Sequence, residues 1–182
     1  MILGLTGSYC SGKDTVADYL VNKKGFLHFS LSDELRKELA SKNIELTREN
    51  LIKYGTNLRK TKGNAVLAEM VLKHIPDDKN SIVTSIRHSS EIEKLKTNKN
   101  FLLVNVDAPI ALRFERMKKR NRPGDPDTFE KFVELEKRES QTEGSGQQLK
   151  ICSEMASSNF INDTKSLEDL YKKIDSFLQS LK

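Results

Sequence analysis

A short segment near the start of the chain, residues 7–15, carries residue types that bind phosphate. Gly7 and Gly12 are separated by four residues, and Lys13 follows directly. Glycine lets the backbone turn successive N–H groups toward one point, which makes an anion-binding nest at the start of a helix. Lys13 adds a flexible ammonium group that reaches the outer phosphates of ATP. The residues expected to contact the nucleotide are Gly7, Ser8, Cys10, Ser11, Gly12, Lys13, Asp14 and Thr15.

The residue after Lys13 is a carboxylate where a hydroxyl side chain normally meets Mg²⁺. Asp14 is followed by Thr15, so the hydroxyl is displaced by one position. Carboxylate and hydroxyl oxygens are both hard ligands for Mg²⁺, and a metal would relieve the repulsion between Asp14 and the anionic nucleotide. We therefore expect Asp14 and Thr15 to bind Mg²⁺ together with ATP.

The segments around this loop follow in the order that phosphate binding requires. Residues 2–6 are an apolar run typical of a buried strand, and apolar residues recur at helical spacing over 15–22. Further strands are expected at 26–29, 81–86, 101–106 and 160–163, and further helices at 32–39, 47–59, 63–72, 91–96, 129–143, 147–157 and 166–181, with another after 109. This alternation indicates an α/β fold with a mostly parallel five-stranded sheet. An ordinary glycine-rich turn is the alternative for residues 7–15.

Length and composition limit the class of protein. The chain has 182 residues, which suits a single domain over 1–182 with one sizeable core. No apolar run approaches the ~20 residues of a membrane span, so we expect a cytoplasmic protein that does not act at a membrane. Cys10 and Cys152 lack the spacing of a disulfide framework or a metal site. The formal net charge of +5 suits ligands that carry phosphate.

The loop also resembles that of a known class of enzymes. Gly4-Leu5-Thr6-Gly7 followed by Gly12-Lys13-Asp14-Thr15 resembles the P-loop of phage-type deoxynucleoside monophosphate kinases, and the opening is similar to dephospho-CoA kinase. Segments 30–39, 54–59 and 104–109 resemble adenylate-kinase-related proteins. This resemblance implies the three-layer P-loop NTPase fold, with helices on both faces of the sheet. It also implies an acceptor-binding insertion at about 31–75 and a lid at about 113–145.

By this resemblance, residues after the second and third strands meet a phosphorylated acceptor. Arg36 would hold the acceptor phosphate and Asp33 would face the reacting centre, while Arg59 is a second candidate for the phosphate. Arg87 matches an arginine that contacts the acceptor phosphate in the related kinases. A solvated pair on the first turn of a helix is the alternative for Asp33 and Arg36.

The strand before Arg87 departs from the related kinases. Those proteins usually carry an acidic residue there that organises Mg²⁺, whereas this chain has Thr84 and Ser85. Asp14 is the residue that could compensate for the missing carboxylate.

A cluster of basic residues precedes a Pro- and Gly-rich turn at 123–127. Arg113, Arg116 and Arg120 lie three and four residues apart, so one helix face could direct them at the transferring phosphoryl group. We therefore predict a mobile lid. A nucleic-acid patch or a solvated basic face is the alternative, although the chain carries no recognised nucleic-acid-binding motif, which argues against nucleic acid. The predicted catalytic residues are Lys13, Asp33, Arg87, Arg116 and Arg120.

The predicted function is ATP-dependent phosphoryl transfer to a nucleoside or deoxynucleoside monophosphate. A phosphate nucleophile is ionised near neutral pH, so it needs positive clamps such as Arg36, Arg59 and Arg87. The ribose hydroxyl of dephospho-CoA would instead need a general base, for which Asp33 is the candidate. Dephospho-CoA kinase activity and a nucleotide-binding module without turnover remain alternatives. The base preference and the oligomeric state stay open.

Overall fold

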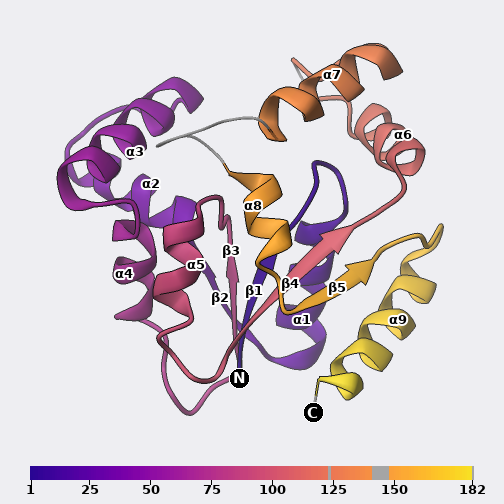
Figure 1. The fold of residues 1–182 in the computed structure, drawn as a ribbon, viewed down its shortest axis with the longest axis horizontal. Helices are drawn as coiled ribbons and strands as arrows, with labels where there is room; N and C mark the ends of the chain where they lie inside the picture. Colours follow the sequence, from indigo (N-terminus) through magenta and orange to yellow (C-terminus); the bar gives the residue numbers. More distant parts are fainter. Residues whose placement is uncertain (123, 141–147, 182) are drawn as a thin grey trace.

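The structure of the chain, a computed structural model, describes residues 1–122, 124–140 and 148–181. In this part of the chain, five strands form one sheet and nine helices surround it (Figure 1). The strands are β1 (Ile2–Thr6), β2 (Leu27–Ser30), β3 (Ser81–Thr84), β4 (Phe101–Asp107) and β5 (Ser158–Ile161). The helices are α1 (Lys13–Lys24), α2 (Leu31–Ser41), α3 (Arg48–Lys62), α4 (Val66–Leu72), α5 (Ser89–Leu95), α6 (Ile110–Arg120), α7 (Phe129–Ser140), α8 (Leu149–Glu154) and α9 (Leu167–Ser180). The predicted α/β fold with a five-stranded sheet is confirmed.

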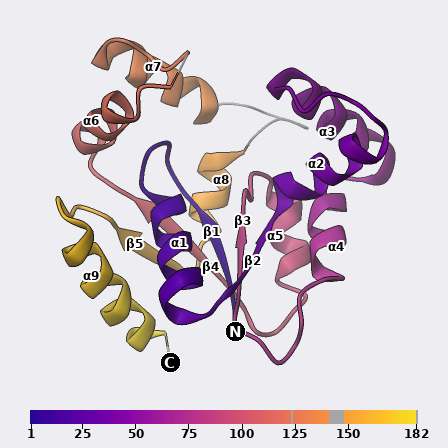
Figure 2. The same ribbon diagram turned by 180° about the vertical axis from the view of Figure 1, so that it is seen from behind.

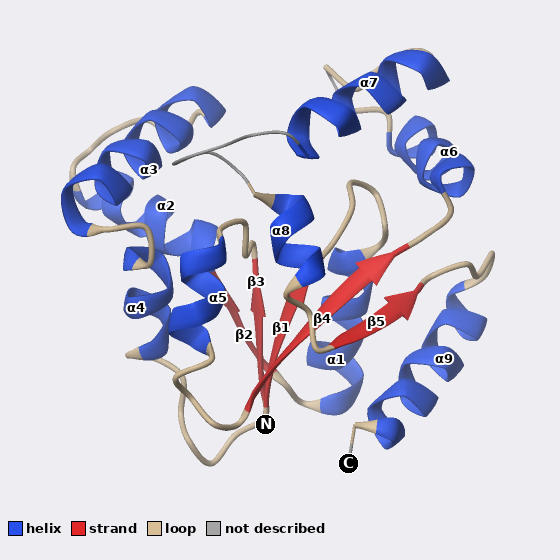
Figure 3. Cartoon of the chain, viewed as in Figure 1, coloured by secondary structure: helices blue, strands red, loops and turns tan. Residues whose placement is uncertain are grey.

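The order of the strands brings the loop after β1 to the middle of one sheet edge. The strands lie in the order β2-β3-β1-β4-β5, and every pairing between neighbours is parallel (Figure 3). Because β1 lies between β3 and β4, the connections that follow these two strands lie on either side of its loop. Open α/β sheets bind ligands outside the carboxyl ends of their strands at such a point.

Alternate residues of the strands are buried on opposite faces of the sheet. Leu3 and Leu5 of β1 pack with α1 and α9, whereas Ile2 packs with the cluster that includes residues of α2, α4, α5 and α8. Figure 2 shows α1 and α9 on one face, and Figure 1 shows α8 in front of the other. Strands of a parallel sheet are buried on both faces, which explains their nearly continuous apolar runs. None of the described helices is both long and apolar enough to cross a bilayer.

Some boundaries differ from the sequence prediction. Helix α2 begins at Leu31, one residue after Ser30, so Ser32 is not its N-cap. Helix α3 continues to Lys62 through the predicted break at 60–63 and ends where Gly63 has a φ of 95°. The third strand ends at Thr84 because Ser85 has a left-handed φ of 63°. The end of the predicted helix 129–143, the start of 147–157 and the end of the predicted lid lie outside the described residues.

Gly4 permits a close approach between β1 and two neighbouring side chains. A Cβ atom at this position would lie 2.5 Å from Cζ of Phe101 and 2.9 Å from Cδ1 of Ile86. Both side chains are buried, so neither can move away into solvent.

We predict that Gly4→Ala lowers the free energy of unfolding by ~1–3 kcal/mol, because it overpacks the core beneath the loop. Urea denaturation of the wild type and the variant measures this change. The cost should be smaller in a Phe101→Leu background, where the ring is removed. An equal cost in both backgrounds would show that Phe101 is not the obstacle.

Candidate active site

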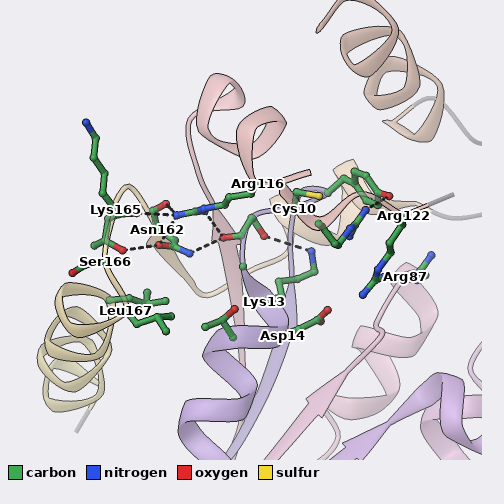
Figure 4. Close-up of a pocket in the computed structure, with 17 residues that line it drawn as sticks. Cys10, Lys13, Asp14, Arg87, Arg116, Arg122, Asn162, Lys165, Ser166 and Leu167 are labelled. Atoms are coloured by element: carbon green, nitrogen blue, oxygen red, sulfur yellow. Dashed lines mark hydrogen bonds between the residues drawn. The ribbon is translucent and has the colours of Figure 1, made fainter. Parts of the chain in front are cut away.

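The connection between β1 and α1 borders a cavity of about 470 Å³ (Figure 4). Gly7 and Gly12 have φ angles of 133° and 95°, which side-chain-bearing residues rarely adopt. A Cβ atom on Gly7 would lie 2.0 Å from the carbonyl oxygen of Val106, and one on Gly12 would lie 2.4 Å from Nδ2 of Asn162. The loop therefore depends on both glycines to pass between β4 and the residues that follow β5. It leads into the N-terminus of α1, where helix N–H groups attract phosphate.

Lys13 folds back over its own loop. Its Nζ donates to the carbonyl oxygens of Gly7 and Ser8, at 2.8 Å and 2.7 Å. Burial lowers the pKa of Lys13 to about 8, although the charge of Asp14 acts in the opposite direction. The two carbonyl groups stabilise the ammonium group where water has been excluded. Phosphate oxygens would have to replace them for Lys13 to bind a nucleotide.

Asp14 and Thr15 lie in the first turn of α1 and border the same cavity. Asp14 is exposed, and it is the one acidic side chain among the described residues that line this cavity. The described residues contain no group of three or more His, Cys, Asp or Glu side chains that could hold a metal ion. Mg²⁺ usually keeps several waters and binds through one or two carboxylates together with phosphates. Asp14 and Thr15 therefore fit Mg²⁺ bound with a nucleotide better than a metal held by protein alone.

The other charged side chains around the cavity are positive, which favours an anionic ligand. Arg87 and Arg122 lie on one side of Lys13, and Lys165 lies on the opposite side, beyond Arg116 (Figure 4). The full set is Lys13, Arg87, Arg116, Arg120, Arg122 and Lys165. A ligand with several phosphate charges would be strongly attracted to this set.

Arg116 of α6 links three parts of the site. Its Nη1 donates to the carbonyl oxygen of Ser11 at 3.2 Å, and its Nη2 donates to the carbonyl oxygens of Asn162 and Thr164, each at 3.1 Å. Asn162 is buried, and its Nδ2 also donates to the carbonyl oxygen of Ser11, at 2.9 Å. Burial lowers the pKa of Arg116. Sequence analysis did not identify Asn162 as a site residue, although a polar residue directly after the last strand was the available signal.

Arg120 connects the loop to the segment between α6 and α7. Its Nη2 donates to the hydroxyl of Tyr9 at 2.5 Å and to both carboxylate oxygens of Asp125, at 2.9 Å and 3.0 Å. The Tyr9 hydroxyl donates to Asp125 Oδ1 at 2.7 Å. Burial raises the pKa of Tyr9, and the hydrogen bond to Asp125 adds to this effect. Asp125 therefore balances the charge of Arg120 while Tyr9 holds both residues against the loop.

Arg113 does not share the place of the other two arginines of α6. It is buried outside the cavity, forms an ion pair with Glu136 of α7, and donates from Nε to the carbonyl oxygen of Ala108 at 2.7 Å. The prediction that all three arginines face the phosphoryl group is therefore wrong for Arg113. Arg116 and Arg120 both line the cavity.

Of the four residues predicted to bind the acceptor, one lines the cavities and three do not. Arg87 lines the main cavity and an adjoining cavity of about 150 Å³. Asp33, Arg36 and Arg59 line neither of them. Arg36 Nη1 donates to Asp33 Oδ1 at 2.5 Å, and both side chains are about half exposed. Arg59 forms a 3.0 Å ion pair with Glu91, which is fully buried.

We predict that nucleotide affinity falls as the pH rises above about 8, because Lys13 then loses the charge that binds phosphate. Bound phosphate favours the protonated form and raises the pKa of Lys13, so binding is strongest below the pKa of the free protein and weakens as the pH passes through it. Titration calorimetry with Mg²⁺ and ATP between pH 7 and pH 10 measures this. Lys13→Arg keeps its charge across that range. A pH dependence that persists in Lys13→Arg would rule out Lys13 as its source.

The sequence matches a known domain and known proteins. Residues 4–133 match the family described as AAA domain. The chain is 31% identical over 186 residues to a UPF0200 protein of Methanocaldococcus jannaschii, with 100% of this chain and 90% of that protein covered. It is 32% identical over 186 residues to a UPF0200/UPF0201 protein of Archaeoglobus fulgidus, with 99% of this chain covered and 55% of the length of that protein spanned.

The fold is also similar to that of a solved small-molecule kinase. Shikimate kinase from Acinetobacter baumannii in complex with shikimate aligns with a TM-score of 0.58, covering 100% of this chain and 94% of that chain. At 18% sequence identity, this likeness concerns the fold alone. The chain therefore carries an AAA-family P-loop domain with a kinase-like fold and belongs to the UPF0200 family.

Proposed function

We propose that this chain transfers the γ-phosphoryl group of ATP to a small phosphorylated acceptor, and that the acceptor is a nucleoside or deoxynucleoside monophosphate. One observation carries the proposal. The two adjoining cavities share Tyr9, Lys13, Asp14 and Arg87. A donor in the larger cavity and an acceptor in the smaller one would therefore meet at Lys13 and Asp14, and Arg87 would lie between them.

The larger cavity suits the nucleotide. Its volume of about 470 Å³ lies within the range of small-ligand sites. The phosphates would bind at the loop and Lys13, so the nucleoside would lie toward the residues that follow β5. Leu167 and Leu170 line that end of the cavity, and Leu167 is 58% exposed. A flat base would gain apolar contact there.

The groups around the reacting atoms support direct transfer between two phosphates. An oxygen of the acceptor phosphate would attack the γ-phosphorus while the bond from that phosphorus to the bridging oxygen breaks, and the electron pair would leave with ADP. Lys13 would exchange the carbonyls of Gly7 and Ser8 for β- and γ-phosphate oxygens. Mg²⁺, when bound at Asp14 and Thr15, neutralises charge on the phosphates. Arg87 would reduce the repulsion between the acceptor and ATP.

The positions of the two candidate carboxylates, Asp14 and Asp33, favour a phosphate rather than a hydroxyl acceptor. Among the described residues that line the smaller cavity, Asp14 is the one Asp, Glu or His side chain. Our proposal already assigns its carboxylate to Mg²⁺. Asp33, which a hydroxyl acceptor such as dephospho-CoA would need, lies outside this cavity and is paired with Arg36. A phosphate nucleophile needs no base. The role of Arg36 as a direct acceptor clamp remains a prediction, whereas Arg59 lies outside both cavities in its ion pair with Glu91.

The proposal is tested by incubating the protein with Mg²⁺, ATP and single acceptors, followed by mass spectrometry of the products. The acceptors are the four ribonucleoside and four deoxynucleoside monophosphates, dephospho-CoA and shikimate, the last taken from the name of the structurally similar kinase. We expect a nucleoside diphosphate. Phosphorylated dephospho-CoA or shikimate would instead establish a hydroxyl acceptor. ATP binding without any product would establish a nucleotide-binding module.

Removing the Arg87 side chain should weaken binding of the acceptor but not binding of ATP. We predict that Arg87→Ala raises the KM for the monophosphate about tenfold or more, since a charge-assisted contact is lost, and leaves the KM for ATP nearly unchanged. Lys172→Ala, which removes an exposed charge on α9, is the control. If the KM for ATP rises and that for the acceptor does not, Arg87 serves the nucleotide.

Removing the Asp14 carboxylate should change the metal requirement. We predict that Asp14→Asn shifts the Mg²⁺ concentration for half-maximal activity upward by roughly tenfold, because a neutral amide is a weaker ligand. Asp18 lies one turn further along the same helix and is exposed outside both cavities. Asp18→Asn is therefore the matched control. A Mg²⁺ titration that is identical in wild type and Asp14→Asn would assign the metal to Thr15 alone.

A further inference from the structure

We propose that Glu91 is a positioning residue that couples helix α3 to the backbone of Arg87. The functional meaning of this coupling rests on the proposed function, in which Arg87 meets the acceptor. Arg59, which the sequence suggested as a direct phosphate ligand, would then act on the acceptor through Glu91 and Arg87. The buried carboxylate of Glu91 makes three contacts that produce this coupling.

Glu91 lies in the first turn of α5 and is completely buried. Its Oε1 accepts a hydrogen bond from Arg59 Nη2 of α3 at 3.0 Å. Its Oε2 accepts from the backbone N–H of Arg87 at 2.9 Å and from that of His88 at 3.1 Å. The two oxygens therefore serve different parts of the fold. One binds α3, and the other binds the turn that presents Arg87.

These contacts exceed what a helix cap requires. On the side of the glutamate, a capping box needs one bond, in which its carboxylate accepts from the backbone N–H of the N-cap residue, here His88. The additional bonds to Arg87 and Arg59 are therefore available for another role. A carboxylate without access to water is strongly destabilising unless it is paired. If α3 moves, Glu91 must follow Arg59 or lose its compensating charge, and either event changes the hydrogen bond to the Arg87 backbone.

The segment that precedes α8 also supports this turn. The carbonyl oxygen of Arg87 accepts from the backbone N–H of Gln148, next to α8, at 2.7 Å. Gln148 Oε1 accepts from the backbone N–H of Ser89 at 3.2 Å. Arg87 is thus held at its N–H by Glu91 and at its carbonyl by Gln148. Glu91 connects this turn to α3 through its carboxylate.

The test compares variants of both partners by two readouts. Arg59→Met removes the ion pair but leaves the bonds from Glu91 to the Arg87 and His88 backbones. Glu91→Gln keeps one oxygen for those bonds but places no negative charge beside Arg59. Arg59→Lys conserves the charge. The control is Lys94→Met, which breaks the 3.2 Å ion pair between α5 and Glu69 of α4 without touching Arg87.

The first readout is amide hydrogen exchange at Arg87 and His88, relative to Val83 in β3, which reports overall stability. The second is the KM for each nucleoside monophosphate that the wild type phosphorylates. We expect Arg59→Met and Glu91→Gln to speed the relative exchange at Arg87 and His88 about tenfold and to raise the acceptor KM by a similar factor, with the ATP KM unchanged. Arg59→Lys should keep both the relative exchange and the acceptor KM close to their wild-type values. Lys94→Met should change neither.

The proposal is overturned if the exchange at Arg87 and His88, relative to Val83, is the same in Arg59→Met and Glu91→Gln as in the wild type. Glu91 would then serve only as a helix cap. If Arg59→Met does not fold, Glu91→Gln gives the decision by the same readouts, with Arg59→Lys as the charge-conserving reference. A wild type that phosphorylates no acceptor would refute the proposed function separately. The exchange measurement would still decide whether Glu91 positions Arg87.

Discussion

The contact of the Lys13 ammonium with the carbonyls of Gly7 and Ser8 is the interaction on which the site depends. It requires a loop that curls back on itself, so Gly7 must pass against the Val106 backbone. That passage in turn requires β1 to lie between β3 and β4 in a parallel sheet. The same enclosure removes water from Lys13 and lowers its pKa to about 8. The cation is therefore held at the centre of the loop by weak partners that phosphate oxygens can replace.

Arg59 of α3 and the three arginines of α6 hold parts of the fold together. Glu136 pairs with Arg113, Asp125 with Arg120, and Glu91 with Arg59, whereas backbone carbonyls bind Arg116. These bonds connect α6 to α7, to the loop and to the connection after β5, and they connect α3 to α5. Buried or half-buried ion pairs contribute orientation at least as much as stability, because desolvation offsets much of the attraction. The arginines of α6 thus hold the loop in place, and the pair of Arg59 and Glu91 supports the turn that carries Arg87.

Local patterns predicted the fold, and long-range pairings limited the prediction of the site. The run 2–6, the glycines and Lys13 were sufficient to predict strand, loop and helix, because each signal lies within a few residues. The partners of Arg59 and Arg113 are separated from them by 32 and 23 residues, so spacing along one helix could not reveal them. Asn162 was missed for the same reason, since its contact with Ser11 spans 151 residues. Helix α3 passed the expected break because helical hydrogen bonding continues to Gly63.

A crystal structure of the protein with Mg²⁺ and a non-hydrolysable ATP analogue tests the central claim most directly. The claim is that the Gly7 and Ser8 carbonyls hold Lys13 in the place of phosphate oxygens. We expect Lys13 Nζ to leave both carbonyls and to bind β- and γ-phosphate oxygens, with Mg²⁺ beside Asp14 or Thr15. A complex in which Lys13 still contacts Gly7 and Ser8 while the phosphates bind elsewhere would contradict this account of the site.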